Sequence, residues 1–160
     1  MLVYWTLFLV PVWAALIPGR LRPSQRWLPG LAVYVGFTLV IGLRYEVGGD
    51  WFNYIPHFAE AGSRTFAESL AMGDPAYYGI NWAVNRAGGS IVHVNLICAA
   101  ILMGGLVTFC RSQPHSWLAL VAAVPYLVIV VGMGYTRQAA ALGFSLVALT
   151  FLGKARVRQF

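Results

Sequence analysis

The sequence predicts an all-α protein: a polytopic transmembrane bundle of about five spanning helices, with short interfacial or re-entrant helices in the segment 44–90. Two observations carry this prediction. Of the 160 residues, 59% are hydrophobic and only 10% are charged, and the mean hydropathy of +0.70 is high for a soluble domain. The charged residues also stand between long apolar runs rather than within them, which is typical of membrane-spanning helices.

Five runs without Asp, Glu, Lys or Arg are the candidate spans: 2–17, 28–43, 91–110, 117–132 and 138–153. Several contain about 16 residues, and a helix of that length reaches about 24 Å against a hydrocarbon core of about 30 Å. Their ends must therefore use interfacial residues or thin the bilayer locally. Most of the tryptophans lie near these ends and suit an aromatic belt. We expect residues 1–160 to form one membrane domain.

The distribution of charge predicts an orientation. The connection 18–27, residue 111 and the residues after 153 together carry seven of the eleven Lys and Arg and no acid, so the positive-inside rule places them in the cytoplasm. The other connections hold four Arg and all five acidic residues. The N-terminus and the segment 44–90 are therefore predicted outside. Because the cations are scattered instead of forming a basic face with aromatics, we expect no nucleic-acid partner.

The segment 44–90 is the only long connection, and it contains helix signals. Thr65-Phe-Ala-Glu68 is a capping box. Asp74 and Pro75 suit the N-cap and first position of a second helix, which Gly88 and Gly89 would end. At about 13 residues this second helix is too short to cross, so we expect it at the interface or as a re-entrant element.

Two polar clusters stand at the outer ends of apolar runs, one at 44–54 and one at 134–138. An Arg at the hydrocarbon edge costs on the order of 2.5 kcal/mol if it sits deep. Binding a phosphate through charge-assisted hydrogen bonds offsets that cost. Arg137 also lies near a predicted helix N-terminus, where free N–H groups and the dipole favour an anion. Arg44 and Arg137 thus indicate an anion site suited to a lipid pyrophosphate.

Each of these features has a structural alternative. An Arg at a membrane boundary also serves as an interfacial anchor or as an ion-pair partner, and Glu46 or Asp50 could pair with Arg44. Gly48 and Gly49 suit either an anion nest or a simple turn. Asp50 suits either a general base or an Asx turn.

The cysteines and histidines do not predict a metal site. Cys98 and Cys110 lie in or beside one apolar run without ligand spacing, so we expect free, buried thiols. His57 and His93 are isolated, and packing or interfacial roles suit them better than ligation. No motif for a divalent metal or a cofactor is present, and we expect neither.

Three strings in this order resemble the EpsG family, a Wzy-like group of multi-spanning proteins from bacterial exopolysaccharide clusters. They are Gly42-Leu-Arg-Tyr-Glu-Val-Gly-Gly-Asp-Trp-Phe-Asn-Tyr54, Asp74-Pro-Ala-Tyr-Tyr78 and Gly134-Tyr-Thr-Arg-Gln-Ala-Ala-Ala-Leu-Gly143. Asp74 stands where the family pattern has Glu before Pro, and the carboxylate is kept. Members usually continue with further spans, so the resemblance implies that residues 1–160 are the N-terminal part of a longer polytopic protein.

The resemblance implies a polymerase at the outer face of the bacterial cytoplasmic membrane that joins repeat units carried on undecaprenyl pyrophosphate. Arg44 and Arg137 would stabilise the leaving pyrophosphate. Asp50, with Glu46 as the second choice, would accept the proton of the attacking sugar hydroxyl. Arg44, Arg137 and Asp50 are the predicted catalytic residues. The predicted substrate-binding residues are Glu46, Gly48, Gly49, Tyr54, Tyr135 and Gln138. The implied partners are the lipid-linked oligosaccharide, membrane lipids and other exopolysaccharide assembly proteins.

Two other functions fit the same residues. A transporter or flippase component for a lipid-linked saccharide would also bind pyrophosphate, and internal repeats with Gly- or Pro-broken spans would favour it. A non-catalytic assembly subunit predicts that neutralising Arg44 lowers protein abundance rather than activity. The sequence shows no internal repeat.

Overall fold

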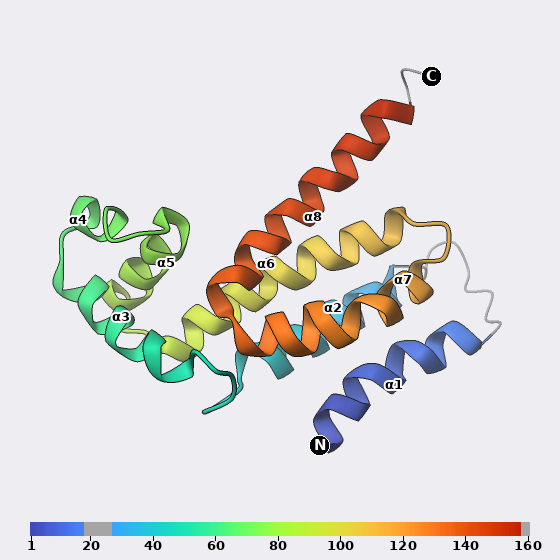
Figure 1. Ribbon diagram of the computed structural model, residues 1–160, viewed down its shortest axis with the longest axis horizontal. Coiled ribbons are helices and arrows are strands. Elements are labelled where there is room, and N and C mark those ends of the chain that lie inside the picture. The colour runs from blue at the N-terminus through green and yellow to red at the C-terminus, as the bar shows by residue number, and fades with distance from the viewer. Residues whose placement is uncertain (18–26, 158–160) are drawn as a thin grey trace.

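The computed structural model describes residues 1–17 and 27–157, with side chains for 1–17 and 27–153, and these residues contain helices and no strand. The cationic connection 18–26, the side chains of Lys154 and Arg156, and Arg158 lie outside the described part. The helices (Figure 1) are α1 (Leu2–Leu16), α2 (Leu28–Gly42), α3 (Trp51–Ser63), α4 (Phe66–Leu70), α5 (Pro75–Arg86), α6 (Ile91–Ser112), α7 (Ser116–Ala123), the π-helix η2 (Val124–Gly132) and α8 (Thr136–Val157).

The apolar runs of the sequence form the long helices, with ends that differ from the predicted ones by a few residues. Among the described residues, one helix is long and apolar enough to cross a bilayer, namely α6 with 22 residues. The helices α1 and α2 and the continuous stretch Ser116–Gly132 are apolar but shorter. The all-helical prediction is confirmed, whereas length and composition do not establish a bundle of five spanning helices.

The helix α6 lies at the centre of the bundle and packs most extensively against α8 and α2 (Figure 1). Glycines permit these close approaches. A Cβ on Gly105 would overlap the carbonyl oxygen of Gly143 on α8, and a Cβ on Gly42 would lie 2.7 Å from the Cα of Leu96. Of the adjacent glycines Gly104 and Gly105, only Gly105 makes a contact that requires glycine.

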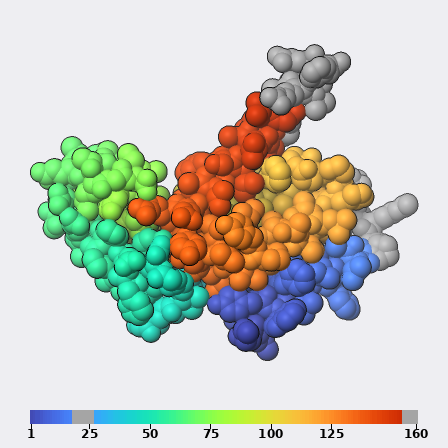
Figure 2. All heavy atoms as spheres, viewed as in Figure 1, coloured from blue at the N-terminus to red at the C-terminus, as the bar shows by residue number. Residues whose placement is uncertain are grey.

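The helices α3, α4 and α5 form a lobe at one end of the molecule (Figures 1 and 2). The capping box predicted at Thr65 is present, with the Glu68 carboxylate accepting from the Thr65 backbone N–H at 2.9 Å. The predicted second helix is α5, which begins at Pro75. The helix α3 was not predicted from the sequence; it has 13 residues, begins directly after Asp50 and contains Pro56.

The acidic residues and the exposed apolar side chains occupy different parts of the molecule. All five acidic residues lie between positions 46 and 74, in the α3–α5 lobe and the chain that leads into it, whereas Arg111 lies at the opposite end of α6. The outward faces of α1, α2 and α8 expose large apolar side chains, among them Trp13 (71%), Leu31 (44%) and Phe144 (58%). Exposed apolar surface of this extent indicates contact with lipid or another protein.

Candidate functional site

The chain between α2 and α3 places the first polar cluster against the junction of η2 and α8. It leaves α2 after Gly42 and turns through two residues in the left-handed region, Glu46 (φ 52°) and Gly48 (φ 109°). A Cβ on Gly48 would lie 2.5 Å from the carbonyl oxygen of Met133. Gly48 is therefore needed both for its backbone conformation and for this close approach.

Arg44 lies buried at this junction, with 5% of its surface exposed. Its Nη1 donates to the carbonyl oxygens of Ile41 (3.0 Å) and Gly132 (2.8 Å), and its Nη2 donates to the hydroxyl of Thr136. The two carbonyls lie at the C-terminal ends of α2 and η2, where backbone acceptors lack helical partners and the helix dipole favours a cation. Arg44 therefore connects two helix C-termini to the N-terminus of α8.

A second buried residue extends this network to α6. The Thr136 hydroxyl donates to Oδ1 of Asn95 at 3.0 Å, and Asn95 is 1% exposed. Within the described part of the chain, Nε of Arg44, Nδ2 of Asn95 and the hydroxyl of Tyr77 have no hydrogen-bond partner. Burial lowers the pKa of Arg44, an effect that the nearby Tyr54 opposes.

A surface pocket of about 350 Å³ lies where α3, α5 and α8 meet. Asp50, Tyr54 and Arg137 line it, together with Asn53, Pro56, His57 and Tyr77. The Tyr54 hydroxyl donates to Oδ2 of Asp50 at 3.4 Å, and the Asn53 amide approaches Oδ1 at 3.5 Å. Burial raises the pKa of Tyr54, and the Asp50 carboxylate raises it further. The pocket thus combines a carboxylate, a protonated phenol and a cation.

Arg137 has a partner that the sequence analysis did not predict. Its Nε lies 3.2 Å from Oδ2 of Asp74, and both side chains are about half exposed. Asp74 occupies the N-cap position of α5, as predicted, but its side chain makes no capping hydrogen bond. Its carboxylate instead connects α5 to the first turn of α8. Neither terminal nitrogen of Arg137 has a partner among the described residues.

The structure brings together some of the predicted site residues and separates others. Asp50, Tyr54 and Arg137 share the pocket, and Arg44 and Gly48 lie at the junction beside it. The remaining four predicted residues do not line the pocket: Glu46, Gly49 and Gln138, which are exposed, and Tyr135, which is half-buried. The ion pair of Arg44 with Glu46 or Asp50, left open by the sequence, is not formed.

Three site residues escaped the sequence analysis: Asn95, Thr136 and Asp74 in its role as the partner of Arg137. Asn95 had a usable signal, because an amide within an apolar run marks a buried polar contact. Among the described residues, no group of three or more His, Cys, Asp and Glu gathers that could hold a metal ion. The predicted free thiols are confirmed, since Cys98 and Cys110 are both unpaired and buried.

Comparison with known proteins gives one match. The family model of the EpsG family matches residues 27–160, which include the Arg44 segment, the Asp74 segment and the start of α8. No curated protein and no solved structure matches the chain. The chain therefore belongs to the EpsG family, and this membership indicates a membrane protein of polysaccharide biosynthesis.

Proposed function

We propose that this chain forms part of a polymerase that joins repeat units carried on undecaprenyl pyrophosphate. The observation that carries the proposal is the pocket in which Asp50, Tyr54 and Arg137 meet, beside the buried Arg44. These residues come from segments far apart in the sequence and supply the two groups that such a glycosyl transfer needs. One group accepts a proton, and the other stabilises the charge of a leaving pyrophosphate.

In the proposed reaction, a sugar hydroxyl of one lipid-linked unit attacks the anomeric carbon of another. A glycosidic bond forms, and the bond between that carbon and the pyrophosphate oxygen breaks. Asp50 accepts the hydroxyl proton, and the electron pair leaves on the pyrophosphate beside Arg137. The terminal nitrogens of Arg137 suit this task because they make no hydrogen bond with the described residues, whereas Nε faces Asp74.

Arg44 has a different place in this proposal. Its terminal nitrogens already donate to Ile41, Gly132 and Thr136, so its main contribution is to hold the start of α8. Neutralising Arg44 therefore lowers abundance in a polymerase as well as in an assembly subunit, and Arg137 is the residue whose neutralisation separates these two functions. Because Arg137 follows Thr136 directly, the position of Arg44 determines where the Arg137 guanidinium can reach. Its buried charge also makes the potential at the pocket more positive, since little water screens it.

For the membrane topology we propose five spans, with the N-terminus and the α3–α5 lobe outside the cytoplasm. The clustering of all five acids towards the lobe and the apolar surfaces of α1, α2 and α8 support this arrangement. The shorter helices would reach only about 22 Å, so local thinning of the bilayer or tilted neighbours must accommodate them. Cysteine-accessibility labelling that placed position 50 in the cytoplasm would refute the orientation.

The proposal is tested by the length distribution of surface polysaccharide in a deletion strain that carries the full reading frame. We expect Arg137→Ala to leave single, unpolymerised units at normal protein abundance. Arg86→Ala is the matched control, because Arg86 is an exposed cation of the same lobe that lies over the Trp82 ring. An unchanged length distribution in Arg137→Ala would contradict the proposal and indicate that Arg137 is an interfacial or ion-pairing residue.

A transporter for the same lipid-linked saccharide is the second candidate, and one observation favours it. The helix η2 is a π-helix that contains Pro125, and the helical structure is interrupted between the end of η2 and the start of α8. Interrupted helices of this kind recur at transporter binding sites. The same strains separate the two functions, because loss of a transporter leaves repeat units inside the cell, whereas loss of a polymerase leaves single units outside.

A further inference from the structure

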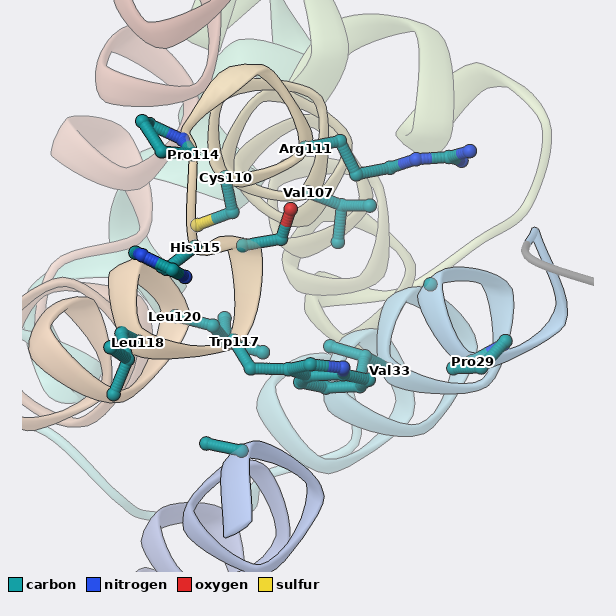
Figure 3. A pocket seen from close by; sticks show the side chains of 13 residues that line it. Pro29, Val33, Val107, Cys110, Arg111, Pro114, His115, Trp117, Leu118 and Leu120 are labelled. Atoms are coloured by element: carbon teal, nitrogen blue, oxygen red, sulfur yellow. The ribbon is translucent and has the colours of Figure 1, made fainter. Parts of the chain in front are cut away.

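A large cavity lies at the end of the molecule opposite the α3–α5 lobe. Its volume is about 980 Å³, and it opens between the end of α1, the start of α2, the end of α6 and the start of α7. Val33, Val107 and Leu120 contribute apolar surface, and Trp117 contributes an aromatic ring from the start of α7 (Figure 3). Arg111 and His115 add polar groups. The cavity therefore has the mixed lining that suits an amphiphile.

The positive charge at this cavity is not neutralised by the described residues. Arg111 is exposed and makes no hydrogen bond or ion pair with them. Its guanidinium lies over the first turn of α2, where a Cβ on Gly30 would be 3.8 Å from Nη1. A helix N-terminus carries positive partial charge, so two positive groups lie side by side. All five acids of the chain lie towards the other end of the molecule.

We propose that this cavity binds the headgroup of an anionic phospholipid. The phosphate would lie between Arg111 and the first turn of α2, and the glycerol and first acyl carbons would contact Trp117 and Val107. Charge complementarity supports this occupant, because basic pockets between helices at the cytoplasmic surface, where the proposed topology places this end of the molecule, bind anionic headgroups. The volume also exceeds what a free phosphate would fill. This binding does not depend on the proposed polymerase activity.

The test measures binding of phosphatidylglycerol and phosphatidylcholine to the full-length protein, purified in a neutral detergent, by native mass spectrometry. We expect phosphatidylglycerol to bind more tightly, and Arg111→Gln to weaken its binding about fivefold. Arg86→Gln, which removes an exposed cation on α5 at the other end, should have no effect. Phosphatidylcholine binding should be the same in all three proteins.

A second variant tests the cavity itself while keeping the charge. Gly30→Leu should fill the cavity from α2, and because a Cβ there meets only ordinary contacts, the fold should tolerate it. We expect this variant to weaken phosphatidylglycerol binding with Arg111 intact. Equal binding of the two lipids, an equal loss in Arg86→Gln, or normal binding in Gly30→Leu would overturn the proposal. Tighter binding of undecaprenyl phosphate than of phosphatidylglycerol would also overturn it and assign the cavity to substrate.

Discussion

Arg44→Ala should destabilise the protein strongly, because the Arg44 side chain satisfies three buried acceptors. Its removal leaves the carbonyls of Ile41 and Gly132 and the hydroxyl of Thr136 without their donor. A buried group that loses its partner costs about 1–3 kcal/mol. These groups share one network and their costs do not add fully, so we expect a loss of roughly 3–5 kcal/mol in the free energy of unfolding.

The assay is thermal unfolding of the purified full-length protein in detergent, together with protein abundance in the membrane. A loss of that size corresponds to a fall of roughly 10 °C in the melting temperature. Arg137→Ala is the matched control, because its exposed ion pair with Asp74 is worth at most about 1 kcal/mol. Arg44→Lys should be intermediate, since lysine keeps the charge but not the planar fork of donors.

Normal accumulation of Arg44→Ala, with a melting temperature within about 2 °C of the wild type, would contradict this role of Arg44. In that case the contacts of Arg44 at the ends of α2 and η2 would contribute little to stability. A normal melting temperature combined with lost polymerisation would instead show that Arg44 acts directly on the substrate. The contrast between Arg44→Ala and Arg137→Ala thus separates a residue that holds the site together from one that contacts the ligand.

Three further predictions concern the packing and the pocket. Gly105→Ala should lower the melting temperature by several degrees because its Cβ would overlap the backbone of α8, whereas Gly104→Ala should have little effect. Gly48→Ala should reduce protein abundance through backbone strain and collision, while Gly49→Ala should be tolerated. Burial raises the pKa of Tyr54 above 10.0, so the Tyr54 phenol loses its proton at a lower pH in the unfolded state than in the folded state. The free energy of unfolding should therefore fall above about pH 10. Denaturation curves measured from about pH 8 to about pH 11 should show a smaller fall in the free energy of unfolding for Tyr54→Phe than for the wild type.

The sequence predicted the long helices well and the irregular elements poorly, for physical reasons. Apolar runs bounded by charge locate α1, α2, α6 and α8 within a few residues, since membrane helices and buried helices need such runs. The helix α3 was missed because Gly48 and Gly49 suggest a turn and Pro56 suggests a break. The π-helix η2 depends on how its backbone packs against neighbouring helices, and the periodicity of apolar residues in the sequence does not reveal that packing.

Some members of the candidate site could be predicted from the sequence, but their contacts could not. Arg44, Asp50 and Arg137 belong to the strings that resemble the family, and each lies at a helix end. Their partners could not be derived, because the contact between Arg44 and Thr136 joins residues 92 positions apart. Asp74 was predicted as an N-cap from its position before Pro75. Only the folded chain shows that its carboxylate forms an ion pair with Arg137.

The most direct test of the proposed polymerase is turnover of a purified lipid-linked repeat unit by the full-length protein in proteoliposomes. Release of undecaprenyl pyrophosphate and growth of the saccharide would be measured together, for the wild type, Asp50→Asn and the control Glu60→Gln. Glu60 is an exposed carboxylate of the same helix, α3, paired with Arg64. We expect Asp50→Asn to lower the rates of both undecaprenyl pyrophosphate release and saccharide growth by about 100-fold or more, and Glu60→Gln to leave both rates unchanged. Wild-type turnover by Asp50→Asn would contradict the assignment of this pocket as the site of glycosyl transfer.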